Sequence, residues 1–166
     1  AASFIVRIGP PDQMRSANGC AHARAGIARH DARKMAAKAE RILVIDDEEW
    51  LREMVQMALE QRGYKAIHAK DGASGVEVAL KQLPDLILCD VNMGAMNGYA
   101  TLSALRNEPT TATIPFILMT GQADNEGMRE GMEKGADDYL PKPFTLDELY
   151  ASVEARFKKA EAVRVQ

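Results

Sequence analysis

The apolar and polar positions after residue 40 fall into five repeats of the same two patterns. Each repeat opens with a short apolar run, which is typical of a strand buried on both faces of a sheet. It continues with a segment whose apolar residues recur every three or four positions, which is typical of a helix packed on a core. The predicted strands are Arg41–Ile45, 64–69, 86–89, 114–119 and 136–140, and the predicted helices are 48–62, 71–82, 99–106, 124–134 and 145–160.

Residues that start or stop helices lie where these patterns change. Asp71 and Thr145 are predicted N-caps, because a short polar side chain can accept a hydrogen bond from a free backbone N–H of the first turn. Gly63 is predicted to end the helix at 48–62, while Pro84 and Pro109 stop the next two helices. Alternating strands and helices of this kind predict an α/β fold with one doubly wound parallel sheet.

Polar residues follow four of the five predicted strands. They are Asp46 and Asp47 after the first, Asp90 after the third, Thr120 at the end of the fourth and Lys142 after the fifth. Ligands of such sheets bind at the carboxyl ends of the strands. Clustered carboxylates repel one another unless a cation lies among them, and Mg²⁺ fits this oxygen-rich set. The set is suited to phosphoryl transfer, in which one carboxylate acts as the nucleophile and becomes an acyl phosphate.

The charge is unevenly divided along the chain. The net charge of −3 combines a basic segment 1–34, with net charge +4, and an acidic remainder with net charge −7. We interpret 1–34 as a disordered or non-native leader, with a basic arm or an organellar address as the alternative. The remaining chain is interpreted as a domain over 35–160 and a tail over 161–166.

The composition excludes several classes of protein. A net charge of −3 argues against a generally basic nucleic-acid binder. The two cysteines lack metal-binding spacing and cannot form a disulfide framework, which favours a reducing compartment. No apolar run approaches the ~20 residues of a membrane span. We therefore expect a cytoplasmic protein with no membrane association.

The motifs at the strand ends together resemble a response-regulator receiver domain, the phosphoacceptor part of two-component signalling. The resemblance runs from Arg41 to about Ala160. Its motifs are Leu43-Val44-Ile45-Asp46-Asp47-Glu48, Leu86-Ile87-Leu88-Cys89-Asp90, Met93-Gly94-Ala95-Met96-Asn97-Gly98, Ile117-Leu118-Met119-Thr120-Gly121 and Gly135-Ala136-Asp137-Asp138-Tyr139-Leu140-Pro141-Lys142-Pro143-Phe144. It implies a flavodoxin-like fold similar to chemotaxis regulators, with five parallel strands in the order 2-1-3-4-5.

The resemblance also implies the roles of the site residues. Asp90 is the implied phosphoacceptor, and Mg²⁺ or Mn²⁺ is bound directly by Asp47 and Asp90, through water by Asp46, and by the backbone carbonyl of Asn92. Lys142 neutralises a phosphoryl oxygen, and its direction is set by a cis bond to the following proline. No turnover enzyme is implied, only self-directed phosphoryl transfer and acyl-phosphate hydrolysis.

A switch is implied as well. Phosphorylation draws the Thr120 hydroxyl inward, Tyr139 turns from exposed to buried, and the face formed by 124–134, 136–140 and 145–160 rearranges. The implied partners are a histidine kinase or phosphotransfer protein and a downstream effector or fused output domain. This face is a candidate homodimer interface, and no direct nucleic-acid contact is expected. Whether the chain is a single-domain regulator or part of a larger protein stays open.

Two departures and two alternatives qualify this interpretation. Gly94 replaces the usual proline and Gly121 the common alanine or serine, so we expect mobile loops around the site. A phosphorylation-independent interaction module is one alternative. An aspartyl phosphatase of the dehalogenase-like superfamily is the other, but it needs an acid two residues after its nucleophile, where this chain has Asn92.

Overall fold

The chain divides into two units, Ala1–Lys38 and Ala39–Gln166. The computed structural model describes residues 38–121, 129 and 131–164, nearly all in the second unit. The predicted leader 1–34 and most of the predicted helix 124–134 therefore lie outside the described residues. Within that helix, Arg129 and residues 131–133 are helical.

The described elements alternate between strand and helix, as the apolar patterns predict. The strands are β1 (Arg41–Ile45), β2 (Lys65–Ala69), β3 (Leu86–Asp90), β4 (Phe116–Thr120) and β5 (Asp138–Pro141). The helices whose two ends are both defined are α2 (Glu49–Gln61), α3 (Gly72–Gln82), α4 (Gly98–Asn107) and α6 (Leu146–Arg164). The strands form one parallel sheet in the order β2-β1-β3-β4-β5, which confirms the predicted fold. Because β1 lies between β2 and β3, the chain reverses its direction of travel across the sheet beside β1 and β3, where ligands of such folds bind.

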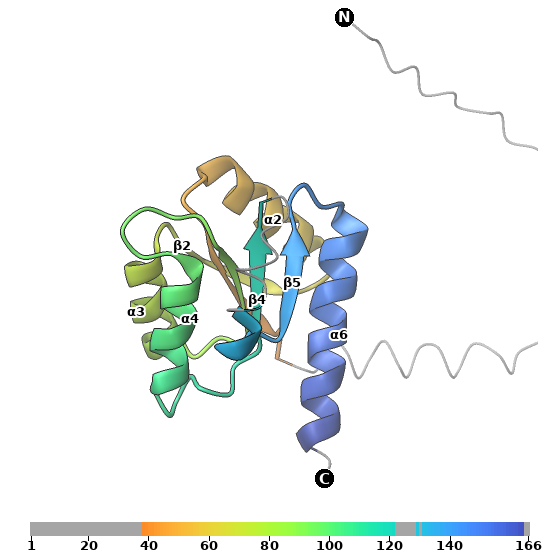
Figure 1. The fold of residues 1–166 in the computed structure, drawn as a ribbon. Helices are drawn as coiled ribbons and strands as arrows, with labels where there is room; N and C mark the ends of the chain where they lie inside the picture. The colour runs from red at the N-terminus through yellow and green to blue at the C-terminus, as the bar shows by residue number, and fades with distance from the viewer. Residues whose placement is uncertain (1–37, 122–128, 130, 165–166) are drawn as a thin grey trace, which may run out of the picture. The chain divides into compact units, whose positions relative to one another are not determined.

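Successive strand residues point to opposite faces of the sheet, so the core has two halves. Helices α2 and α6 pack on one face, around Val44, Leu88 and Ile117. Helices α3 and α4 pack on the other face, around Ile45, Cys89 and Leu118 (Figure 1). Each central strand is buried on both sides, which explains its continuous apolar run.

The predicted caps are present. The Asp71 side chain accepts a hydrogen bond from the Ser74 N–H at 2.8 Å. Thr145 Oγ1 accepts one from the Glu148 N–H at 3.2 Å, and the Thr145 N–H donates one to Glu148 Oε2 at 2.7 Å. These two reciprocal bonds form a capping box at the start of α6.

Three boundaries differ from prediction by two residues or more. Strand β4 begins at Phe116, because Pro115 has no N–H to donate to the ladder. Strand β5 begins later than Ala136, whose N–H bonds to Gly131 O in the preceding helical segment. Helix α6 continues to Arg164, beyond its predicted end near Ala160. Among the described residues, no helix has the length and apolar character needed to cross a membrane.

Candidate functional site

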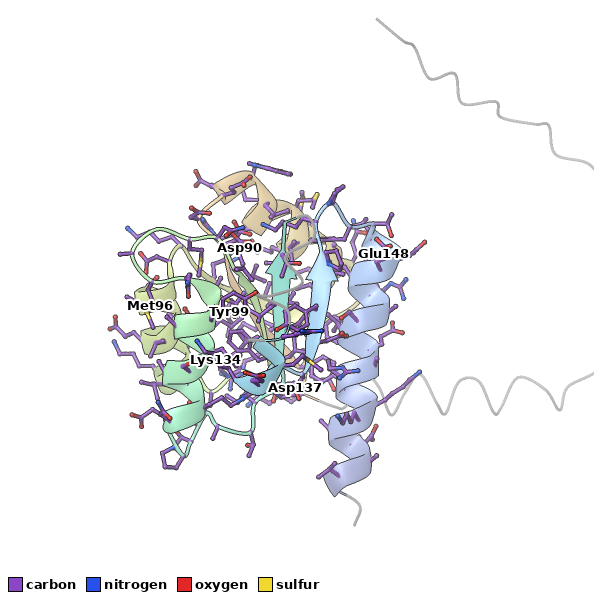
Figure 2. The ribbon with its side chains drawn as sticks, in the orientation of Figure 1. Asp90, Met96, Tyr99, Lys134, Asp137 and Glu148 are labelled. Carbon is purple, nitrogen blue, oxygen red and sulfur yellow. The ribbon has the colours of Figure 1, made fainter. Side chains whose placement is uncertain are left out.

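Three carboxylates meet at the carboxyl ends of two neighbouring strands. Asp46 and Asp47 follow β1, Asp90 ends β3, and the pairing of Ile45 with Cys89 brings these ends side by side. Each aspartate offers an oxygen within 4.8 Å of those of the other two. Figure 2 shows Asp90 at the edge of the sheet toward which the β4 and β5 arrows point. The acidic cluster predicted from sequence is therefore assembled by the fold.

Lys142 joins this cluster from the end of β5. Its Nζ lies 2.8 Å from Asp46 Oδ2 and 3.2 Å from Asp90 Oδ1. Its backbone N–H donates to Thr120 O at 2.6 Å, which ties the end of β5 to the end of β4. The Lys142–Pro143 peptide bond is cis, as the resemblance implies. We call Asp46, Asp47, Asp90 and Lys142 the acidic pocket.

The two adjacent aspartates have different surroundings. Asp46 is fully buried, and both of its carboxylate oxygens are bonded: Oδ1 accepts from the Glu48 N–H at 2.9 Å and Oδ2 from Lys142. Asp47 is exposed. An incoming cation therefore reaches Asp47 directly, whereas Asp46 is already engaged by the protein.

Burial and neighbouring charge shift two pKa values in the pocket. Burial raises the pKa of Asp90, and the charges of Asp46 and Asp47 add to this effect, while Lys142 opposes it. Burial by itself lowers the pKa of Lys142, but its hydrogen bond to Asp46 and the two carboxylate charges raise it overall. The ammonium is therefore retained, and it only partly neutralises three acidic groups.

The loop after β3 folds tightly around Asp90. A side chain at Gly98 would place its Cβ 2.5 Å from Asp90 O, so only glycine fits this approach. Asn97 caps α4 by accepting from the Ala100 N–H at 2.9 Å. The predicted helix 99–106 leaves out Gly98 and this cap, although an asparagine just before a helical stripe is a recognisable signal. Asn92 is exposed, and its carbonyl remains a predicted metal ligand.

The predicted switch residues lie on the neighbouring strands β4 and β5. Thr120 is half-buried at the end of β4, and Tyr139 lies on β5 with its hydroxyl oxygen buried. A Cβ on Gly131 would overlap the Tyr139 hydroxyl and lie 2.9 Å from Tyr99 Cε1. We call Tyr99 and Tyr139 the tyrosine pair. Lys134 Nζ lies 6.0 Å from the Tyr99 ring centroid, and Figure 2 shows both side chains.

The acidic pocket fits a hard divalent cation. It offers carboxylate oxygens from three residues, one of them exposed, and no sulfur or imidazole ligand. Mg²⁺ is held in proteins by one or two carboxylates and keeps several waters, which this partly open arrangement allows. Asp47 and Asp90 are the residues that would hold it, with Asp46 behind them.

One contact of the pocket has no signal in the sequence. Arg52, in the first turns of α2, donates from Nη1 to the backbone oxygen of Asp46 at 2.7 Å. The helical pattern places Arg52 on a polar position of the helix and gives no reason to aim it at the strand end. This contact can be identified only from the three-dimensional structure of the turn between β1 and α2.

Comparison with known proteins agrees with this geometry. The model of the response regulator receiver domain family matches residues 42–154. The phosphate regulon transcriptional regulatory protein PhoB of Escherichia coli is 38% identical over 128 residues, covering 77% of this chain and 56% of PhoB. A probable chemotaxis protein CheY of Rhizobium etli is 35% identical over 122 residues, covering 73% of this chain and 95% of CheY.

A solved structure adds a magnesium-bound example. The receiver domain of the sensor histidine kinase PA1611 of Pseudomonas aeruginosa, with magnesium coordinated in its active-site cleft, is 26% identical with a TM-score of 0.66. The match covers 71% of this chain and 97% of that domain. This chain spans about half the length of the PhoB proteins it matches. By its sequence, its strand order and its acidic pocket, the chain belongs to the response regulator receiver domain family of two-component systems.

Proposed function

We propose that this receiver accepts a phosphoryl group from a phosphohistidine onto Asp90 in a Mg²⁺-dependent reaction. The donor is a histidine kinase or a phosphotransfer protein. The observation that carries the proposal is the meeting of Asp46, Asp47 and Asp90 within 4.8 Å, with Lys142 bonded to two of them. A carboxylate that is buried for structural reasons needs one cationic or hydrogen-bonding partner. Here three carboxylates share one ammonium, so part of their negative charge is left for a bound cation to neutralise.

Each residue has a defined task in this proposal. An oxygen of Asp90 attacks phosphorus while the bond to the donor imidazole breaks. Lys142 stays charged and neutralises a phosphoryl oxygen, and Thr120 donates its hydroxyl to another. Mg²⁺ would supply neutralisation of the phosphoryl charge when bound. Asp47 and Asp90 would hold it, assisted by the Asn92 carbonyl, and Asp46 orients Lys142.

The output in this proposal is a change in partner affinity. Movement of Thr120 changes the space beside Tyr139, and the surface of β5, α6 and the segment ending at residue 134 responds. The partners are a downstream effector or a fused output domain, with a second copy of the chain as a further candidate. We place the protein in the cytoplasm, without direct nucleic-acid contact through the receiver itself.

A phosphodonor assay tests this function. The chain is incubated with acetyl phosphate, with Mg²⁺ or with EDTA, and its intact mass is followed over time. We expect one added phosphoryl group per chain, only with Mg²⁺, and none in Asp90→Asn. The control Asp85→Asn removes an exposed carboxylate just before β3, at the opposite end of that strand, and should label normally.

Two results would contradict the proposal. Absence of labelling in the folded wild-type chain would favour a phosphorylation-independent interaction module. Release of many phosphate equivalents per chain would favour a phosphatase, although the position of its required acid is occupied by Asn92.

A further inference from the structure

Asp47 combines an exposed side chain with an immobilised backbone. Its carboxylate is exposed and is the group that an incoming cation meets first. The side chain of an exposed turn residue ordinarily adopts several orientations. A metal site with such a ligand binds its cation less tightly, because the ligand must be ordered when the cation binds. What holds Asp47 therefore decides how well the pocket binds a cation.

Both peptide units that flank Asp47 are anchored. A peptide unit is planar, so a bond to one of its atoms restrains both of its Cα atoms. The unit before Asp47 contains the Asp46 carbonyl, whose oxygen accepts a hydrogen bond from Arg52 Nη1 at 2.7 Å. The unit after Asp47 carries the Glu48 N–H, which donates to Asp46 Oδ1 at 2.9 Å. Asp46 itself is fixed by its N–H bond to Ala69 O at 3.2 Å and by Lys142.

Arg52 is well placed for this task. It lies in the second turn of α2, half-buried, and its own N–H bonds to Glu48 O at 3.1 Å. The guanidinium thus reaches back over the first turn to a carbonyl of the turn that precedes the helix. A charge-assisted bond of this kind is stronger than a neutral one, and the planar fork loses little freedom in making it.

We propose that Arg52 is a positioning residue of the metal site, which aims Asp47 at the cation by holding the Asp46 carbonyl. This inference rests on the proposed function, since it assigns a task at that same pocket. Positioning and charge predict opposite effects of removing Arg52. The Arg52 guanidinium lies one peptide unit from Asp47 and repels a divalent cation, so removing it would tighten Mg²⁺ binding if charge alone mattered. The sign of the effect therefore separates positioning from simple charge.

Calorimetric titration with MgCl₂ measures that sign. Arg52→Met and Arg52→Gln both remove the charge, and we expect both to weaken Mg²⁺ binding by roughly ten-fold, the usual loss for an outer-shell partner. Arg52→Lys should recover part of the loss, because its ammonium can donate to the same oxygen. Arg62→Met, at the other end of α2, removes the same charge together with contacts to Glu154 and Tyr150, and should leave the affinity unchanged.

A second background tests the route through Asp47. In Asp47→Asn, whose Mg²⁺ affinity is already reduced, adding Arg52→Met should cause little further loss, because both changes act on the same ligand. Thermal unfolding in EDTA checks that each variant is folded. If Arg52→Met does not fold, Arg52→Gln is used in its place.

The outcomes are distinct. Unchanged or tighter binding in the uncharged variants, no recovery in Arg52→Lys, or a full ten-fold additional loss in the Asp47→Asn background would each overturn the inference. A wild-type chain that binds no Mg²⁺ would overturn the proposed function together with it. A wild-type chain that binds Mg²⁺ and labels Asp90 while the Arg52 variants bind normally would overturn the inference alone.

Discussion

The acidic pocket and the tyrosine pair are built on opposite principles. In the pocket, geometry is set by polar bonds: Asp46 is bonded at its N–H, its carbonyl and both carboxylate oxygens. Around Tyr139, a close steric fit limits the neighbouring chain, because its hydroxyl occupies the place where any other residue at 131 would put a Cβ. The contrast separates a network of polar bonds at the strand ends from a region beside β5 where the size of one residue is critical.

The largest effect is expected from Lys142→Met. It leaves the buried carboxylates of Asp46 and Asp90 without their ammonium, and breaking a buried pair costs about 3 kcal/mol. Urea unfolding at neutral pH in EDTA measures the loss. The control Lys81→Met breaks a pair with Glu77 that is exposed on both sides, and should change stability by less than about 0.5 kcal/mol. Equal effects of the two variants would mean that the pocket is not held by its bonds.

Gly131→Ala tests the other region and is expected to be the next largest. The added methyl group overlaps the Tyr139 hydroxyl, and overpacking costs about 1–3 kcal/mol. In a Tyr139→Ala background the overlap with the hydroxyl is removed and the contact with Tyr99 Cε1 at 2.9 Å remains, so the same change should cost clearly less. The helix preference of alanine over glycine, about 1 kcal/mol, offsets part of what remains. Gly94→Ala, which meets nothing within 4 Å, is the control. A loss of the same size without the Tyr139 ring would refute the steric account.

A smaller effect is expected from the raised pKa of Asp90, since Lys142 offsets part of the burial. The folded chain holds this proton to a higher pH than the unfolded chain does. Between the two pKa values the folded state binds more protons, so its stability falls as pH rises above the usual value of 3.8. Asp90→Asn should lack this decline, and its advantage over wild type should grow with pH in Mg²⁺-free denaturation. A pH-independent difference would argue against a raised pKa.

The smallest effect is expected from Ser152→Ala. Ser152 Oγ on α6 donates to Asp138 Oδ2 on β5 at 2.9 Å, and Asp138 is only half-buried. Loss of this bond should cost about 0.5–1 kcal/mol by urea unfolding, because water replaces much of it. A cost comparable to that of Lys142→Met would show that polar bonds fasten both regions equally and would remove the contrast between them.

The parts of the molecule that sequence predicts are those with a periodic or chemical signal. The buried strands, the order of elements, the Asp71 and Thr145 caps and the gathering of the strand-end carboxylates all follow from apolar periods and known cap chemistry. Contacts to backbone atoms outside helix caps do not follow, since every residue offers the same backbone. The bond from Arg52 to the Asp46 carbonyl and the fit of Tyr139 against Gly131 depend on turns whose geometry no local pattern specifies.

The bond between Lys142 and Asp46 joins residues 96 positions apart in the sequence. During synthesis the carboxylates of β1 and β3 emerge early, while the lysine arrives with the last strand. Contacts of such separation form only after the intervening chain has been ordered. A nascent or truncated chain thus carries the acidic residues before the lysine that pairs with them, and the acidic pocket is assembled only when the domain is complete.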